Sequence, residues 1–260
     1  MQDAEVDEQA GGDRDFVASL EKGLLVIEAF DASRPRLTLS DVAKLTGITR
    51  AAARRYLRTL TRLNYADFDG RYFSLSPRIL RLGYAYLSST SLSMRLQPFL
   101  ERVSEETGES SSAAILDGDE IVYIARAATR RIMSIGLGVG SRLPAYCTSL
   151  GRAILANRPE AEIEAYLARV RLEAKTPKTV TSKAELRRLL EETRSRGYAI
   201  VNEELELGLR SIAVPLVQKN GQVTIALNIS AQAGRVPAAE MEERFLPALE
   251  AAGEALRYTF

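Results

Sequence analysis

Two short helical patterns, separated by a short turn that contains a glycine, constrain the fold of this chain more than any other feature. In "LTLSDVAKLTG" a helix is expected to begin after Thr38, with Asp41 three residues on, where its charge suits the first turn. Gly47 ends this helix, since glycine readily takes the left-handed conformation at that position. The next stretch, "ITRAAARRYLRTL", predicts a second helix from about Arg50, capped by Thr49. A helix, a short turn and a second helix form a helix-turn-helix.

The second helix has one apolar side and one basic side. Its apolar positions are Ala53, Tyr56, Leu57, Leu60 and Leu63, and the arginines at 50, 54, 55, 58 and 62 fall mainly on the other side. Long donors on an outer face suit a helix that lies in the major groove of DNA, where arginine can contact guanine or clamp phosphate. A basic, solvated helix face is also common in proteins of any function, so the helix alone leaves both interpretations open.

The region around this helix favours DNA binding. The stretch "NYADFDGRYFSLSP" predicts two short strands joined at Asp69-Gly70, a strong hairpin signal, and this hairpin would be the wing of a winged helix-turn-helix. Residues 16–90 carry twelve bases and six acids, whereas residues 1–15 carry six acids and one arginine. This asymmetry points to an anionic partner for the basic segment. We therefore predict binding of double-stranded DNA.

Individual contacts can be assigned within this hypothesis. Phosphate contacts position a protein on DNA and base contacts specify the sequence. Alanines at the start of the helix are small enough to let the backbone approach the bases. The residues assigned to the groove-facing start of the helix are Thr49, Arg50, Ala51, Arg54 and Arg55, and those assigned to phosphates are Arg58, Arg62 and Arg71. The hypothesis predicts a steep fall in affinity with salt.

After Gly108 the hydrophobic period changes, which indicates a second domain. The stretch "SSAAILDGDEIVYIARA" predicts a hairpin with Asp117-Gly118 at its turn, and "LRSIAVPLVQKNGQVTIALNIS" predicts another. Helices flank these strands, one of them with a Ser182…Glu185 capping box. The expected fold class is α+β. The predicted parts are a disordered acidic tail (1–15), a winged helix-turn-helix (16–76), a linker helix (77–91) and a mixed α/β domain (92–260).

Composition narrows the possible chemistry. The chain contains no histidine and one cysteine, Cys147, which excludes a Ser-His-Asp triad, histidine metal sites and an intrachain disulfide. The stretch "GLGVG" has the wrong spacing for a phosphate-binding loop, and the acidic run "NEELE" is a weak metal site without histidine. We therefore expect a buried, structural Cys147, no cofactor and no metal.

Two further expectations concern location and function class. No apolar run is long enough to span a bilayer, and the N-terminus lacks the apolar stretch of a signal peptide, so the cytoplasm is the expected location. The alternative to a DNA-binding protein is an enzyme that acts on small organic acids, with the N-terminal unit as an accessory. That alternative needs a general base, and none is evident in the sequence.

Several motifs, in order, resemble the IclR family of transcriptional regulators across residues 16–258. "SLEKGLLVIEAF" and the helix-turn-helix stretch are similar to its DNA-binding domain, and "LPAYCTSLGRAILA" and "EELELGLRSIAVPL" to its effector-binding domain. The resemblance implies a homodimer, often associating further into tetramers, that binds palindromic operators. It also implies a GAF-like α/β domain that binds a small organic acid. "ITRAAARRYLRTL" with "YCTSLGRAILA" is similar to the subgroup (the PcaR, PcaU and PobR type) that controls aromatic-acid breakdown through the β-ketoadipate pathway.

The resemblance also implies where the effector binds: beside the helix after the glycine-rich loop, near the "EE…GLR" loop, and on the last strands. Amides at a helix start bind carboxylates well, which suits the stretch beginning "TSLG". Arg142 or Arg152 could neutralise the acid, although either could equally be a surface residue. Bulky Leu150 and nearby Tyr146 suggest an apolar, aromatic ligand. The pocket positions carried over by motif are Ser149, Leu150, Asn202, Ser211, Asn228 and Ser230.

Overall fold

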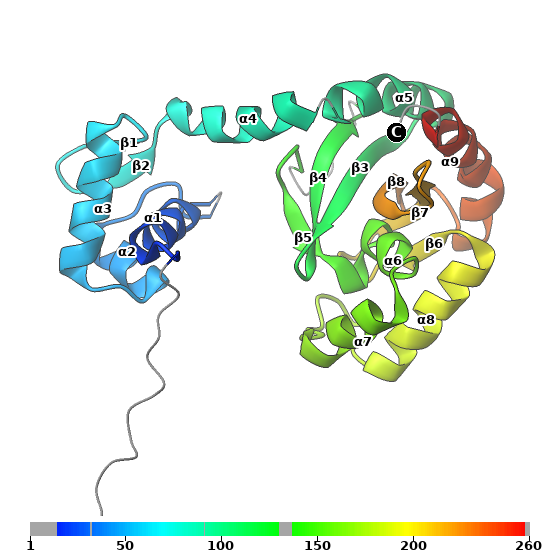
Figure 1. Cartoon of the computed structure of the whole chain (residues 1–260). Helices are drawn as coiled ribbons and strands as arrows, with labels where there is room; N and C mark the ends of the chain where they lie inside the picture. Colours follow the sequence, from blue (N-terminus) through cyan, green and yellow to red (C-terminus); the bar gives the residue numbers. More distant parts are fainter. Residues whose placement is uncertain (1–14, 32, 91, 130–136, 258–260) are drawn as a thin grey trace, which may run out of the picture. The chain divides into compact units, whose positions relative to one another are not determined.

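The computed structural model describes residues 15–31, 33–90, 92–129 and 137–257. Residues 1–14 of the predicted acidic tail, and Gly136 of the "GLGVG" stretch, lie outside the described residues. The chain divides into two compact units, Met1–Tyr86 and Leu87–Phe260 (Figure 1), and the division falls within helix α4 (Leu80–Thr90). Each unit has its own buried core.

The first unit is a helix-turn-helix followed by a small hairpin. The helix α2 (Leu39–Thr46) begins as predicted, because the Thr38 hydroxyl accepts the N–H of Asp41 and the Asp41 carboxylate accepts the N–H of Thr38. Gly47 ends this helix with a φ of 70°. The predicted helix-turn-helix is confirmed. The elements of the unit before α4 are α1 (Ala18–Glu28), α2 (Leu39–Thr46), α3 (Arg50–Arg62), β1 (Ala66–Phe68), β2 (Phe73–Leu75) and the 3-10 turn η1 (Pro77–Ile79).

The core of the first unit fixes which side of α3 meets solvent. Val26 of α1, Val42 of α2 and Leu57 of α3 are fully buried against one another. Thr49 caps α3 as predicted, accepting the N–H of Ala52 at 3.2 Å. α3 therefore turns its apolar side inward and leaves its basic side exposed.

The second unit is an antiparallel sheet with helices on both faces. Among the described residues its six strands follow the order β5-β4-β3-β8-β7-β6. The strands are β3 (Ser110–Asp117), β4 (Glu120–Ala127), β5 (Arg142–Pro144), β6 (Ala199–Asn202), β7 (Leu209–Val217) and β8 (Val223–Gln232). The helices of this unit after α4 are α5 (Leu92–Thr107), α6 (Ser149–Leu155), α7 (Glu160–Arg169), α8 (Lys183–Arg196) and α9 (Met241–Arg257), with the 3-10 turns η2 (Ala145–Cys147) and η3 (Ala238–Glu240). This architecture confirms the predicted α+β class.

Helices α5 and α9 cover one face of the sheet, and α6 covers the other (Figure 1). The sheet presents small side chains to α6, among them Ala114, Ala213 and Ala226, which let the helix approach closely. Gly151 of α6 makes the tightest approach, because a Cβ atom there would lie 2.3 Å from the carbonyl oxygen of Ala145. α6 is therefore held directly against the η2 turn.

Two local predictions need correction. The two residues between β3 and β4 are Gly118-Asp119, so the turn lies one residue later than the predicted Asp117-Gly118. The glycine takes the first turn position with a φ of 62°, a conformation that suits glycine best. Ser182 accepts the N–H of Glu185 as predicted, but the box is incomplete because the Glu185 carboxylate pairs with the guanidinium of Arg188 instead.

Candidate functional site

The outer side of α3 carries a stripe of arginines. Arg50, Arg54, Arg58 and Arg62 follow one another at four-residue spacing, so they lie on one face of the helix, and Arg55 lies on the neighbouring face. All five are exposed, and within the residues that the structure describes none of their side chains has a hydrogen-bond or ion-pair partner. A face of unshielded guanidinium groups suits an anionic partner.

A groove of about 740 Å³ separates α3 from the hairpin. Arg54, Arg58 and Arg62 line it from α3, and Phe68 and Arg71 line it from the hairpin. Phe68 is half exposed and stacks on a buried ring of β2. The groove thus brings together Arg54, which the sequence analysis assigned to bases, and all three arginines that it assigned to phosphates. The other predicted DNA-binding positions, which do not line the groove, are Thr49, Arg50, Ala51 and Arg55.

The tip of the hairpin is fixed by one carboxylate. Asp69 accepts the backbone N–H of Tyr72 at 2.7 Å and that of Arg71 at 2.9 Å, and it pairs with Arg36. The hydrogen bond from the Tyr72 N–H contributes most to holding the pKa of Asp69 below its ordinary value. The guanidinium groups of Arg36 and Arg71 both lie near the Tyr72 ring, at 4.9 and 5.1 Å from its centroid. The arginine at the tip is therefore carried by an ordered turn.

In the second unit, the sheet face under α6 changes from apolar to polar along its strands. Strand pairing aligns Arg126 of β4, Ser112 of β3 and Asn228 of β8 in one row, next to the alanines that α6 covers. Residues paired across strands project from the same face. A second row consists of Ser110, Ser230 and Ser211. The result is a polar platform at one end of the α6 face.

The start of α6 closes a small cavity over this platform. The cavity has a volume of about 20 Å³, room for roughly one water molecule. Asn202 of β6 does not line it; its side-chain oxygen instead accepts the Nε–H of Arg210 at 2.6 Å. Five of the six predicted effector positions line the cavity, namely Ser149, Leu150, Ser211, Asn228 and Ser230.

Two polar atoms in this cavity have no hydrogen-bond partner within the described residues. They are the Ser149 hydroxyl and the side-chain oxygen of Asn228, and both residues are buried. The Asn228 amide nitrogen donates to the Ser230 hydroxyl at 3.2 Å, which leaves its oxygen as a free acceptor. Because buried polar groups are nearly always hydrogen-bonded, two orphaned ones in one cavity indicate a ligand site.

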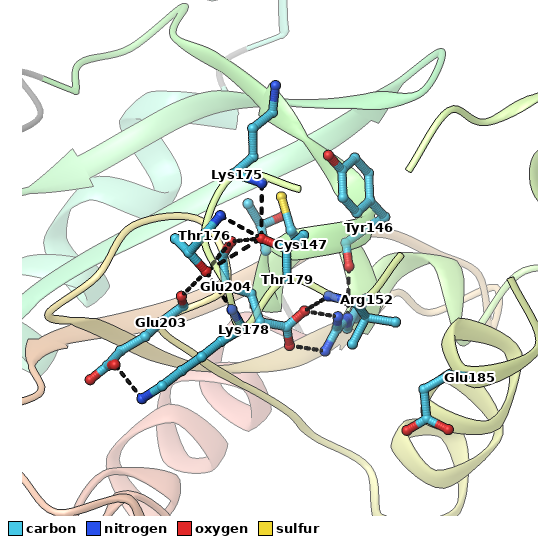
Figure 2. A network of polar contacts seen from close by, with 12 residues as sticks. Tyr146, Cys147, Arg152, Lys175, Thr176, Lys178, Thr179, Glu185, Glu203 and Glu204 are labelled. Atoms are coloured by element: carbon cyan, nitrogen blue, oxygen red, sulfur yellow. Dashed lines mark hydrogen bonds and ion pairs between the residues drawn. The ribbon is translucent and has the colours of Figure 1, made fainter. Parts of the chain in front are cut away.

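Arg142 and Arg152, the two arginines that the sequence analysis considered as partners for the effector's carboxylate, are both engaged by acids of the protein. Arg152 is buried, and its guanidinium meets the Glu204 carboxylate in a two-pronged pair at 2.7 and 2.6 Å (Figure 2). Its Nε–H donates to the carbonyl oxygen of Tyr146 at 2.8 Å. Arg142 is exposed and pairs at 2.7 Å with both Asp117 and Glu120. Both guanidinium groups are already neutralised by the protein's own acids.

Arg126 is the cation that sequence reasoning missed. Its side chain is half-buried and lines the cavity, where its one hydrogen bond to a described residue is a long one, 3.4 Å, to the Ser112 hydroxyl. No acid pairs with it among the residues that the structure describes. Simple alternation along "YIARA" would place Arg126 on the face opposite Tyr123. A register shift between Ala113 and Ala114 gives β4 one extra residue and brings Arg126 to the α6 face, where it pairs with Ser112.

The remaining candidates of the second unit have structural roles. Cys147 is buried as predicted, and burial raises the pKa of its thiol to about 11, which makes it a poor nucleophile. In the acidic run, Glu204 pairs with Arg152, and Glu203 pairs with Lys178 (Figure 2). No cluster of acids and cysteine able to hold a metal is found in the described parts of the chain. No helix in those parts combines the length and apolar character needed to cross a membrane.

Relatives carry the same two parts in the same order. The IclR helix-turn-helix domain matches residues 19–70, and the C-terminal domain of the bacterial transcriptional regulator IclR matches residues 84–258. The Pca regulon regulatory protein of Pseudomonas putida is 48% identical over 94% of this chain and 84% of its own length. The p-hydroxybenzoate hydroxylase transcriptional activator of Acinetobacter baylyi is 39% identical, over 94% and 92%.

Solved structures agree with these sequence matches. A transcriptional regulator from Rhodococcus sp. RHA1 superposes with a TM-score of 0.81 at 44% identity, covering 94% of this chain and 98% of that one. An IclR homolog from Microbacterium hydrocarbonoxydans, solved in complex with 4-hydroxybenzoate, superposes with a TM-score of 0.75 at 25% identity, covering 92% and 99%. The paired domain matches and the identity over nearly the whole chain place this protein in the IclR family of bacterial transcriptional regulators.

Proposed function

We propose that this protein is a cytoplasmic, ligand-responsive regulator of catabolic genes that binds an operator through α3 and the β1–β2 hairpin and an aromatic acid through the second unit. The observation that carries the proposal is the exposed stripe of unpaired arginines on α3. Related regulators named for the pca genes and for p-hydroxybenzoate hydroxylase support control of aromatic catabolism. The family consists of transcriptional regulators, which decides against the enzyme alternative.

The arginines divide into two groups by their expected contacts. Arg58, Arg62 and Arg71 line the groove between helix and hairpin, which suits a sugar-phosphate strand passing between them. Arg50 and Arg55 lie outside that groove, near the N-terminal end of α3, where a recognition helix reads base edges. Arg54 lines the groove and is also one turn from the helix start, so we assign it to bases at the edge of the phosphate path.

Salt dependence provides the test. The Arg58→Ala and Arg62→Ala variants should each bind duplex DNA more weakly, with the slope of log affinity against log salt reduced by about 0.9 for each lost phosphate contact. Binding would be measured by fluorescence anisotropy on a duplex that the wild-type protein selects from a random-sequence library. The control is Arg188→Ala, which removes an exposed arginine from the second unit.

Each outcome of this experiment bears on the proposal. Arg54→Ala should lose roughly 1–3 kcal/mol of discrimination between the selected duplex and a scrambled one. If the α3 variants bound DNA with the affinity and slope of the control, the assignment of α3 would be wrong. If the wild-type protein selected no sequence at all, operator binding itself would be refuted.

A homodimer on a palindromic operator completes the proposal. Apolar side chains at helical spacing on and just before α1, Phe16, Leu20 and Leu24, are 56%, 63% and 46% exposed, which is unusual for a face with no partner. Leu80 and Tyr84 of α4 are also largely exposed. We propose that these residues contact a second copy, and that the linker helix (77–91) joins the DNA-binding domain (16–76) to the effector domain (92–260).

A further inference from the structure

We infer that Arg126 holds the carboxylate of the effector, and that the effector's opposite end donates a hydrogen bond between Ser149 and Asn228. This inference rests on the proposed effector site and specifies the ligand it takes: an aromatic acid with a hydroxyl group on the ring, far from the carboxylate. The acid therefore lies over β4 and β3, away from the start of α6.

Charge is the first reason. Every other residue that lines the cavity, among those the structure describes, is uncharged, so the guanidinium of Arg126 sets the charge of the site. A half-buried cation without an acid is unfavourable, and an incoming carboxylate removes that penalty. The planar guanidinium can also bind both carboxylate oxygens at once, which fixes the orientation of the acid.

The start of α6 is the weaker place for the carboxylate. The Thr148 hydroxyl already accepts the N–H of Gly151, so one of the amides there is occupied. The helix is only seven residues long, so its dipole is small. Neutral amides give weaker hydrogen bonds to an anion than a guanidinium group does. The helix start therefore suits the neutral end of the ligand.

The chemistry of the other end follows from the orphaned atoms. The Asn228 side-chain oxygen carries no proton, so it can only accept a hydrogen bond, and no described group donates one to it. The amide nitrogen of the same side chain donates to the Ser230 hydroxyl. The Ser149 hydroxyl can donate or accept. A ligand hydroxyl satisfies both atoms, whereas a methoxy group has no proton for Asn228. The site thus requires a donor at this end.

The spacing of the strand backbones leaves room for a single ring between the two ends once the cavity widens. Ser112 separates Arg126 from Asn228 in their row, so the two outer backbones lie two strand spacings apart, roughly 9–10 Å. Leu150, Leu205 and Leu209 provide apolar walls for the ring between them. The guanidinium of Arg126 reaches Ser112 at 3.4 Å, so it has to swing away from Ser112 before a ring with polar groups on opposite sides can enter between it and Asn228.

The test compares three small molecules on the full-length protein by isothermal titration calorimetry. 4-Hydroxybenzoate should bind the wild-type protein more tightly than 4-hydroxybenzamide, which lacks the charge, and than 4-methoxybenzoate, which lacks the donor. Arg126→Gln should weaken binding of 4-hydroxybenzoate roughly 10- to 150-fold, the range for a lost hydrogen bond to a charged group. The same variant should bind the amide about as well as the wild type does. Arg126→Lys should restore part of the affinity for the acid.

Two controls separate the possible outcomes. Arg142→Gln removes an exposed arginine that does not line the cavity and should leave binding unchanged. Urea unfolding of Arg126→Gln, followed by circular dichroism, would show whether the second unit of the variant folds; if it does not fold, the comparison of acid with amide on the wild-type protein decides. Equal binding of the acid by wild type and Arg126→Gln, or of acid and amide by wild type, overturns the inference and leaves the proposed function intact. If none of the three compounds binds the wild-type protein, both the inference and the proposed aromatic effector are wrong.

Discussion

Replacing Arg152 by methionine would leave the Glu204 carboxylate buried without its main partner. The two side chains are only 2% and 9% exposed, and the carboxylate keeps just one other described hydrogen bond, from the Val180 N–H at 3.1 Å. Breaking a buried ion pair by removing one member costs about 3–5 kcal/mol, because the remaining charge is uncompensated. For a unit of this size, such a loss lowers the melting temperature by roughly 6–20 °C.

The effect should reach the cavity as well. The carbonyl oxygen of Glu204 accepts the Thr179 hydroxyl at 2.6 Å, so the pair and the threonine together hold this loop (Figure 2). The next residue, Leu205, lines the cavity. The Arg152→Met variant is therefore expected to lose effector affinity in addition to stability, as measured by titration calorimetry at a temperature where it is still folded.

A double variant provides the critical comparison. Arg152→Met with Glu204→Leu removes both charges, and replacing a buried pair by apolar side chains is often neutral or stabilising, so much of the lost stability should return. Urea unfolding followed by circular dichroism would measure all three proteins. The exposed Arg188–Glu185 pair is the control, and its Arg188→Ala variant should unfold at nearly the wild-type urea concentration. A loss below about 1 kcal/mol in Arg152→Met, or no recovery in the double variant, would refute the reasoning.

Four other substitutions test features of the fold and of the proposed dimer. Gly151→Ala should destabilise the second unit and lower its melting temperature, because the new Cβ would meet the Ala145 carbonyl oxygen at 2.3 Å. Thr38→Ala should cost about 1 kcal/mol in urea unfolding through loss of the cap. Hydrogen bonding from Thr38 lowers the pKa of Asp41 in the folded protein. The ionised Asp41 therefore stabilises the fold above its unfolded pKa of about 3.9, and this stabilisation is lost as the pH falls through the folded pKa. The difference in unfolding free energy between wild type and Asp41→Asn should shrink between pH 6 and pH 2. Leu24→Glu should convert a dimer to a monomer in sedimentation velocity, and an unchanged dimer would exclude this face of α1 from the interface.

The first unit was predictable because its signals are local. The cap at Thr38, the glycine at 47 and the arginine spacing of α3 all act within a few residues, so the sequence contains the whole interaction. The structure leaves the assigned DNA contacts as predictions, but it shows that no described acid shields the α3 arginines. In the second unit, by contrast, even the place of the turn after Asp117 required the strand register.

The cavity was less predictable because its residues meet only through the sheet. Motif similarity selected Ser211 and Asn228, which line the cavity, but it could not show that Arg210 lies directly across from Asn202 and engages its side chain. Arg152 meets an acid 52 residues away, which no local pattern reveals. Arg126 faces the cavity only because β3 pairs with β4 and β8 in one particular register. Contacts of this kind depend on topology rather than on periodicity.

The small size of the cavity has a kinetic consequence. A space that holds roughly one water molecule cannot admit an aromatic ring, so the protein must first widen it, or widen it as the ligand enters. If opening comes first, the observed association rate in stopped-flow experiments should level off at high ligand concentration, at the rate of opening. The fraction of time spent open would then lower the apparent affinity, and a substitution that favours the open form would make the regulator respond to less ligand.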